Sequence, residues 1–231
     1  MRFAITLLAF SQLLAAQTFP AVQEKRLWPD ARGEIRITEN GMEFQKAGEE
    51  AVLRWAYPDI QHFDRVSRTE FVLLSYEDAG WRKLGRDRQF RFRITSGELS
   101  DGLFETMQQR LRKPVTDRAV GQISGAEYEL PVKHLHSWGG CEGRLIFTAD
   151  TIYYQTNHAQ DARTWQIARD IQSVWSLDLY QMELHVYENN RREFSQTRIF
   201  NFALKEPLDP VFYRTLKLKL YELESTHLAV R

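Results

Sequence analysis

Two histidines and the only cysteine of the chain lie close together in the sequence. His134 and His136 are separated by one residue, and Cys141 follows five positions later. In an extended strand, residues two apart point to the same side, so both imidazole rings would face one point. A cysteine in the following turn could reach that point. Two imidazole nitrogens and one thiolate sulfur form a ligand set suited to zinc or copper, so the spacing indicates a candidate metal site.

The same residues have a second interpretation that involves no metal. Two histidines at the rim of a strand and a small buried cysteine in a tight turn give the same spacing, and structural zinc sites usually show four clear ligands. A fourth ligand does not stand out, although His158 or His185 could approach. As a single thiol, Cys141 forms no disulfide within the chain. It is therefore buried and inert, paired with another chain, or part of a metal or redox-sensing site.

A second group of residues could bind an anion. Six cations occupy a predicted loop and the strand after it, where they could meet phosphate, an anionic lipid head group or an acidic polymer. They are Arg82, Lys83, Arg86, Arg88, Arg91 and Arg93. The competing interpretation, which we favour, is a solvated strand face whose charge is neutralised by Glu77, Asp78 and Asp87.

The charge balance limits the classes of partner. The chain has 231 residues, with 31 Lys and Arg against 31 Asp and Glu, so it has no overall field to attract nucleic acid or an anionic membrane. We therefore expect a protein or a small anionic ligand as partner, and no cofactor other than the zinc or copper considered above. Motifs such as Gly-x-Ser-x-Gly, a phosphate loop or His-Glu-x-x-His do not occur, but this does not exclude an enzyme, since catalytic triads are recognised by geometry. Internal duplication of a small domain favours a binding scaffold, and an enzyme of unknown reaction is the third interpretation.

The elements that would position these residues belong to an internal repeat. The stretch 33–45 has a counterpart 110 positions later at 143–155, and Trp55 matches Trp165 at the same spacing. In both copies a glycine opens an alternating strand, turn residues reverse the chain, and an aromatic-rich strand ends in Gln. Asn40-Gly41 is a strong hairpin signal because both residues tolerate positive φ. Two copies of about 100 residues predict two small domains.

The candidate metal ligands belong to the second copy alone. At the repeat spacing, the counterparts of His134, His136 and Cys141 in the first copy are an acid, a base and an alanine, namely Glu24, Arg26 and Ala31. A metal site formed by these residues would therefore be a property of the second domain.

Each copy predicts short alternating strands followed by one helix. The first helix begins at Ser100 or Asp101 and stops at Lys113-Pro114, and the second begins at Asp209-Pro210 with Asp as its cap. A bent sheet with a helix at its open end buries the apolar faces of both. We therefore predict a mainly β protein with two consecutive domains, each an antiparallel sheet or barrel of about six or seven strands capped by a C-terminal helix.

This pattern resembles the pleckstrin-homology-like (PH-like) superfold, including bacterial PH and GRAM-type variants, over nearly all of residues 19 to 225. The chain also resembles a group of uncharacterised exported bacterial proteins with His-x-His before a Gly-Cys-x-Gly turn, matched here by residues 134–143. The resemblance implies PH-like domains at 19–113 and 128–225, joined by a linker at 114–127. Phosphoinositide-binding PH domains carry cations between their first two strands. The corresponding loops here are poor in Lys and Arg, so lipid head-group binding is not implied.

The N-terminal residues predict export. Met1-Arg2 precedes an apolar run that ends in Ala15-Ala16, the pattern of a secretory signal peptide. The run is shorter than the roughly 20 apolar residues that a membrane span needs. We expect a signal peptide at 1–16 and a secreted or periplasmic protein, with an uncleaved anchor or a buried first helix as alternatives. The predicted function is an exported, non-enzymatic binding protein. The alternative is a metal-binding or thiol redox-sensing protein.

Overall fold

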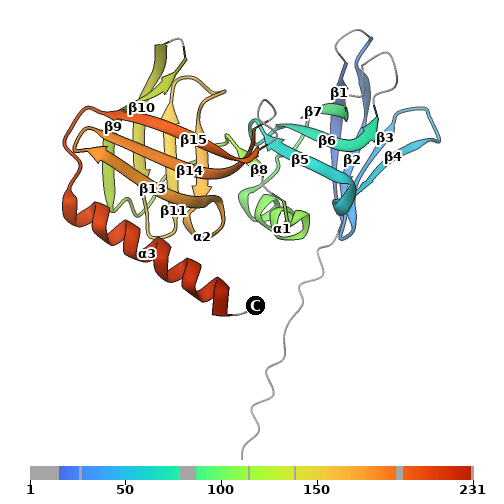
Figure 1. Ribbon diagram of the computed structural model, residues 1–231. Helices are drawn as coiled ribbons and strands as arrows, with labels where there is room; N and C mark the ends of the chain where they lie inside the picture. The colour runs from blue at the N-terminus through green and yellow to red at the C-terminus, as the bar shows by residue number, and fades with distance from the viewer. Residues whose placement is uncertain are drawn as a thin grey trace, which may run out of the picture.

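A computed structural model describes residues 16–25, 28–78, 87–113, 115–137, 139–190 and 195–229. Nearly all of the expected signal peptide lies outside these ranges, and so do three residues of the basic stretch, Arg82, Lys83 and Arg86. The described chain forms two β-sheets that lie side by side, the first from the N-terminal half and the second from the C-terminal half (Figure 1).

The first sheet has eight strands in the spatial order β4-β3-β2-β1-β7-β6-β5-β8. Neighbouring strands are antiparallel except β5 and β8, which are parallel. A short 3-10 helix follows β4, and a longer helix follows β7. The elements are β1 (Gln17–Glu24), β2 (Ala31–Ile37), β3 (Gly41–Lys46), β4 (Val52–Ala56), η1 (Tyr57–Asp59), β5 (Ile60–Arg65), β6 (Glu70–Asp78), β7 (Asp87–Ile94), α1 (Asp101–Leu111) and β8 (Val115–Asp117).

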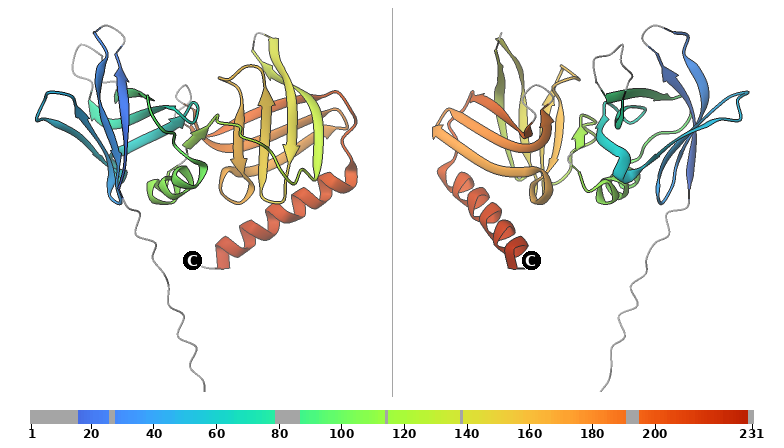
Figure 2. Two further views of the ribbon diagram at one scale, coloured as in Figure 1. Left: turned by 180° about the vertical axis from the view of Figure 1, so that it is seen from behind. Right: turned by 45° about the vertical axis from the view of Figure 1, so that its right-hand side comes forward.

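The second sheet has seven strands in the order β12-β11-β10-β9-β15-β14-β13, and all neighbours are antiparallel. The long C-terminal helix α3 lies below this sheet in both views of Figure 2. The elements are β9 (Tyr128–His136), β10 (Gly139–Phe147), β11 (Thr151–Thr156), β12 (Arg163–Gln166), α2 (Ile167–Asp170), β13 (Ile171–Asp178), β14 (Gln181–Asn190), β15 (Ser195–Leu204) and α3 (Pro210–Ala229).

The two sheets confirm the predicted mainly β fold with two consecutive domains, each with a helix after its last long strand. In each copy the first strand pairs with both the second strand and the seventh, which bends the sheet around one core. Among the described residues, no pairing joins the outer strands of either sheet. Neither domain is therefore a closed barrel.

The internal repeat is visible in the two cores. Trp55 packs against Phe90 with ring centroids 4.6 Å apart, and Trp165 packs against Phe200 at 4.8 Å. All four side chains are buried. The two tryptophans are 110 residues apart, and so are the two phenylalanines. The two copies therefore use the same positions for the same aromatic contact, which contributes to each core through its buried area.

Both helices begin where the sequence predicts. The Ser100 hydroxyl accepts a hydrogen bond from the Leu103 amide at 3.3 Å before α1, and Asp209 accepts one from the Val211 amide at 2.7 Å before α3. These contacts satisfy amides that have no partner inside a helix. Arg112 ends α1 in the left-handed region, at φ 51°. Of the helices in the described ranges, none is both long enough and apolar enough to span a membrane.

The hairpin predicted at Asn40-Gly41 joins β2 to β3, but its turn differs from the expected one. Neither residue has a positive φ. Instead, the Thr38 hydroxyl accepts a hydrogen bond from the Gly41 amide at 3.2 Å. A Cβ added at Gly41 would lie 2.0 Å from the carbonyl oxygen of Trp55. The position therefore requires glycine for space rather than for backbone conformation.

Replacing Gly41 with alanine should lower the free energy of unfolding by about 1–3 kcal/mol, because the added methyl group overpacks the hairpin. Gly102→Ala is the control, since a Cβ at this position in α1 meets no atom within 4 Å. It should raise the free energy of unfolding by about 0.5–1 kcal/mol. Urea denaturation measures both changes, and a loss of the same size in the two variants would contradict the close-approach explanation.

The two sheets differ in how one edge is covered. In the first sheet β8 pairs with the edge of β5, with Phe63 opposite Val115. In the second sheet the edge strand β13 is approached by α3, and the Ser176 amide donates a hydrogen bond to the Tyr213 hydroxyl at 3.1 Å. β8 lies within the segment 114–127 that was expected to link the domains, so this segment begins as part of the first sheet.

Candidate metal centre

The two histidines of the candidate site lie at the end of β9, in the hairpin that this strand forms with β10. The register places His134 opposite Cys141 and His136 opposite Gly139. The imidazole rings lie on the same side of the strand, as their spacing predicts, with ring centroids 4.4 Å apart. One hairpin therefore carries all three residues that the sequence singled out.

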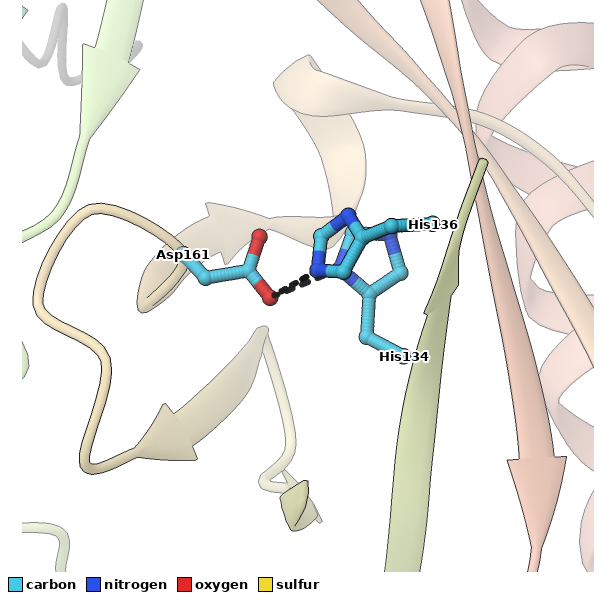
Figure 3. Close-up of side chains that lie close together, drawn as sticks. All are labelled: His134, His136 and Asp161. Atoms are coloured by element: carbon cyan, nitrogen blue, oxygen red, sulfur yellow. Dashed lines mark hydrogen bonds and ion pairs between the residues drawn. The ribbon is translucent and has the colours of Figure 1, made fainter. Parts of the chain in front are cut away.

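Asp161 joins this site from the turn between β11 and β12. Its Oδ2 atom lies 2.8 Å from Nδ1 of His134 and 3.3 Å from Nε2 of His136. One ligand atom from each of the three side chains lies within 4.8 Å of the other two. Figure 3 shows both rings directed at the same carboxylate oxygen. Three side chains of metal-ligating types therefore converge on one point.

The site is buried on one side and open on the other. The side chains of His134 and Asp161 are 4% and 8% exposed, whereas that of His136 is 35% exposed. Burial favours the neutral form of Asp161, but the hydrogen bond with His134 and the electrostatic influence of His134, His136 and Arg163 outweigh it and lower the pKa of this carboxyl group. The carboxylate is therefore ionised at neutral pH, which is the form that binds a cation.

Aromatic side chains fix the buried histidine. The ring of His134 lies 5.1 Å from that of Phe200 and 5.2 Å from that of Phe202, centroid to centroid. Tyr154 lies beside it and donates a hydrogen bond from its hydroxyl to the carbonyl oxygen of Cys141 at 2.7 Å. Burial raises the pKa of Tyr154 to about 12, so the phenol remains a donor at neutral pH. These contacts hold the hairpin and one ring in a defined orientation.

Cys141 is partly exposed, and its sulfur lies outside the group of ligand atoms within 4.8 Å of one another that His134, His136 and Asp161 form. Desolvation raises the pKa of its thiol, and the Asp161 carboxylate raises it further through its negative charge and through a hydrogen bond with the thiol. Reactive redox thiols have a lowered pKa, so this environment does not favour a redox sensor.

A buried ion pair supports the turn that carries Asp161. Arg163 is 1% exposed and pairs with Glu188, which is 3% exposed, at 3.0 Å. Nη1 of Arg163 also donates to the carbonyl oxygens of Gln160 at 2.9 Å and Ala162 at 2.8 Å. Asp161 lies between these two residues in the chain, so its backbone is held on both sides.

The structure describes three of the six residues of the basic stretch, all on β7. Arg88 pairs with Glu77 at 2.9 Å, and Arg93 pairs with Glu24 at 3.1 Å. Arg91 lies opposite Glu24 in the ladder between β7 and β1. Carboxylates on neighbouring strands therefore face this part of the stretch, as expected for a solvated strand face.

The sequence interpretation missed Asp161, although a signal for it exists. At the repeat spacing of 110, Asp161 corresponds to Ala51, so it is specific to the second copy in the same way as His134, His136 and Cys141. The histidines considered as fourth ligands do not join the group. His158 is exposed in the turn before Asp161, and His185 lies 3.5 Å from Glu183 on β14.

Comparison with known proteins adds little to this description. No family model matches the chain, and no curated protein matches it. One solved structure that it resembles is titled "Structure of the Spt16D Pob3N heterodimer", with 12% sequence identity, coverage of 74% of this chain and 83% of that chain, and a TM-score of 0.34. A likeness of this strength supports no argument about the function of the chain.

Proposed function

We propose that the second domain binds one divalent transition-metal ion through His134, His136 and Asp161, and that Cys141, which lies opposite His134 in the hairpin, turns toward the bound ion as the fourth ligand. We refer to these four residues as the metal centre. The observation that carries the proposal is the convergence of the two imidazole nitrogens on one carboxylate oxygen, at 2.8 and 3.3 Å. The proposed role is metal binding.

The ligand types and separations favour zinc. Zinc binds imidazole nitrogen, carboxylate oxygen and thiolate sulfur at about 2.0–2.3 Å, with tetrahedral geometry. Two ligand atoms about 2.1 Å from a tetrahedral ion lie about 3.4 Å apart. The distance of 3.3 Å between His136 and Asp161 is close to that value. The 2.8 Å between His134 and Asp161 is a hydrogen-bond distance, so these two atoms would separate when an ion binds between them. Calcium and magnesium prefer sets of oxygen ligands, so they fit these residues poorly.

The competing interpretation is a hydrogen-bonded polar cluster that only stabilises the hairpin. The first copy argues against it. Its register corrects the match expected from the spacing of 110, because Gln23, and not Glu24, lies opposite Ala31 and Phe92 as His134 lies opposite Cys141 and Phe202. The corresponding hairpin thus forms with Gln23 and Ala31, and with Ala51 at the position of Asp161. The fold therefore does not require a histidine and carboxylate cluster at this place. Two imidazole rings that share one carboxylate oxygen are more simply explained as ligands of one cation.

Metal titration tests the proposal. The protein is stripped with a chelator, reduced, and titrated with zinc in competition with a chromophoric chelator, with magnesium and calcium as comparison ions. We expect one zinc ion per chain and no competition from the other two ions. The titration is run at protein and metal concentrations at which the chelator detects micromolar zinc affinity of the protein. If the protein binds no zinc under these conditions, the proposal is refuted.

We also propose that the chain is exported and that both domains are PH-like. Export rests on the pattern of residues 1–16 and on the start of β1 at Gln17, directly after the expected cleavage point. The PH-like assignment rests on the pairing of the first seven strands, which both copies share: strands one to four and strands five to seven form two antiparallel series, joined by the pairing of the first strand with the seventh. The helix after the seventh strand completes the pattern.

Expression of the full chain in a bacterium with a secretory pathway should yield a mature protein that begins at Gln17. A cleaved leader lowers the intact mass by that of residues 1–16, and N-terminal sequencing identifies the cut. Replacing Ala16 with a bulky residue such as tyrosine should leave the precursor uncleaved, since signal peptidases require small residues there. Wild-type protein that keeps Met1 in the cytoplasmic fraction would contradict the proposed export.

A further inference from the structure

The turn that supplies Asp161 is held by two arginines that come from opposite sides. Arg163 donates to the carbonyl oxygen of Gln160 from within the second domain, at 2.9 Å. Arg118 donates to the same carbonyl oxygen at 2.9 Å and to the side-chain oxygen of Gln160 at 2.6 Å. Gln160 directly precedes Asp161, so both guanidinium groups act on the backbone next to the metal centre.

Arg118 is anchored in the first domain. It follows β8, and its guanidinium forms a two-pronged contact with the carboxylate of Asp64 on β5, at 2.9 and 2.7 Å. The two side chains are only 17% and 15% exposed. Partial burial and bidentate geometry make such a pair stronger and more directional than an exposed one. The guanidinium of Arg118 is thereby oriented with its remaining N–H groups toward Gln160.

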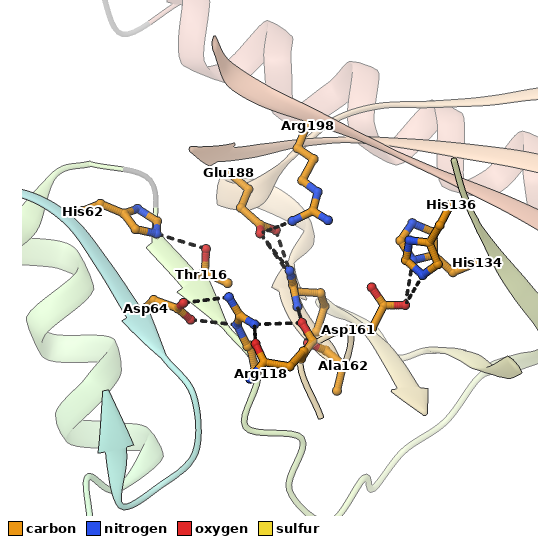
Figure 4. A network of polar contacts seen from close by, with 12 residues as sticks. His62, Asp64, Thr116, Arg118, His134, His136, Asp161, Ala162, Glu188 and Arg198 are labelled. Carbon is orange, nitrogen blue, oxygen red and sulfur yellow. Dashed lines mark hydrogen bonds and ion pairs between the residues drawn. The ribbon is translucent and has the colours of Figure 1, made fainter. Parts of the chain in front are cut away.

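The surrounding contacts give this bridge a fixed frame. The backbone N–H of Arg118 donates to the carbonyl oxygen of Arg65 at 2.9 Å, and the Thr164 hydroxyl on β12 donates to the carbonyl oxygen of Ala119 at 3.3 Å. The backbone of Arg118 is thus tied to the first sheet, and that of the next residue, Ala119, to the second. Figure 4 shows the chain of contacts from Asp64 through Arg118 to the turn beside His134 and His136.

From this geometry we infer that Arg118 and Asp64 are positioning residues for the metal centre, so that docking of the first domain sets the metal affinity of the second. The inference rests on the proposed function. The carboxylate of Asp161 must lie within about 2.0–2.2 Å of a bound ion, and a turn freed on one side holds it there less often. Because linkage is reciprocal, a bound ion also stabilises the docked arrangement of the two domains.

Zinc affinity of the full chain tests the inference in Arg118→Gln, in Asp64→Asn and in the double variant. Loss of a group that orients a ligand costs about 10–100-fold in metal affinity, and we expect Arg118→Gln to fall in this range. Asp64→Asn should weaken zinc binding in the same direction, and the double variant should bind no more weakly than Arg118→Gln, since both changes break one path. Arg68→Gln is the control, because Arg68 pairs with Glu98 and Asp101 inside the first domain.

Two further measurements separate positioning from a general loss of stability. The absorption spectrum of the cobalt-loaded protein reports ligand geometry, so it should change in Arg118→Gln and stay unchanged in Arg68→Gln. Amide hydrogen exchange in the metal-free protein should be faster at 158–162 in Arg118→Gln. If Arg118→Gln does not fold, Asp64→Asn, which keeps the arginine, provides the same comparison.

The outcomes are distinct for the two proposals. Wild-type zinc affinity and an unchanged cobalt spectrum in both Arg118→Gln and Asp64→Asn would overturn the positioning role and leave metal binding intact. Equal weakening in Arg68→Gln would also overturn it, since that residue does not contact the turn. Wild-type protein that binds no zinc would overturn the metal centre itself, and the inference with it.

Discussion

Zinc affinity is expected to fall by more than about 100-fold when His136 is replaced by alanine. Loss of a residue that only orients a ligand costs about 10–100-fold, and loss of a direct ligand should cost more. His136 is the best first test because its side chain is 35% exposed, so its removal leaves the core intact. The remaining nitrogen, oxygen and sulfur ligands would leave a site with an open position.

Asp161→Asn provides an independent test of the same centre. The amide keeps the shape of the carboxylate but removes its charge, so zinc affinity should again fall by at least about 100-fold. His158→Ala is the matched control, because His158 is exposed in the same turn and lies outside the group of converging ligand atoms. Chelator competition measures all three variants, and unchanged affinity in His136→Ala and Asp161→Asn would refute the assignment of these ligands.

The second large effect is expected for Arg163→Leu, which should lower the free energy of unfolding by about 3–5 kcal/mol. Removal of one partner of a buried ion pair leaves the other charge without full compensation. Glu188 would retain Arg198, at 3.1 Å, but that arginine is 35% exposed and covers one side of the carboxylate only. The carbonyl oxygens of Gln160 and Ala162 would lose a donor as well.

Arg144→Leu is the control for this variant. Arg144 pairs with Glu129 in the same sheet, but the two side chains are 60% and 39% exposed. An exposed pair contributes about 0–1 kcal/mol, so its loss should have a small effect. Urea denaturation followed by tryptophan fluorescence measures both variants. Equal losses of unfolding free energy in the two variants would contradict a larger contribution from the buried Arg163 pair.

The effect of Arg163→Leu should also depend on pH. Burial alone would raise the pKa of Glu188, but Arg163 and Arg198 outweigh it and hold the pKa below its usual value. A lowered folded-state pKa means that the pair contributes stability above the unfolded-state pKa, about 4.3, and loses it as the pH falls through the folded-state value. The difference between wild type and Arg163→Leu should therefore shrink below about pH 4. A difference that stays constant from pH 7 to pH 3 would contradict this account.

The fold was predictable where the signals are local. Ile35 and Ile37 alternate with polar residues and are fully buried on the inner face of β2. Ser100 and Asp209 mark the starts of the two helices because capping depends on residues three positions away at most. Because the chain repeats, the strand and helix signals of the first copy recur in the same order in the second. Such features need no knowledge of how distant strands pair.

Two features could not be predicted because distant parts of the chain create them. β8 is three residues long and has no hydrophobic period of its own, and its pairing with β5 spans more than fifty residues. Arg163 and Glu188 occur in alternating strands where charged residues usually face solvent, and the packing of the strands buries them. Neither feature leaves a pattern within a short window of sequence.

The candidate site was predictable in part for the same reason. His134 and His136 share a strand, so their common direction follows from the period of two. Asp161 is 27 residues from His134, and only the folded sheet brings the turn between β11 and β12 to the end of β9. Comparison of the two copies position by position would have marked all four residues of the metal centre as replacements specific to the second copy.

The pairing of β8 with β5 determines where the chain can be truncated after the first copy without exposing an unpaired sheet edge. A fragment that stops at the end of α1 would leave the outer N–H and C=O groups of β5 free to recruit a strand from another molecule. A fragment that continues through Asp117 would keep that edge closed and retain the contact between Asp117 and Arg65 at 2.7 Å. In the first copy the sheet edge is therefore covered by β8, a strand that follows α1 in the chain. In the second copy part of the edge strand β13 is covered by Tyr213 of α3.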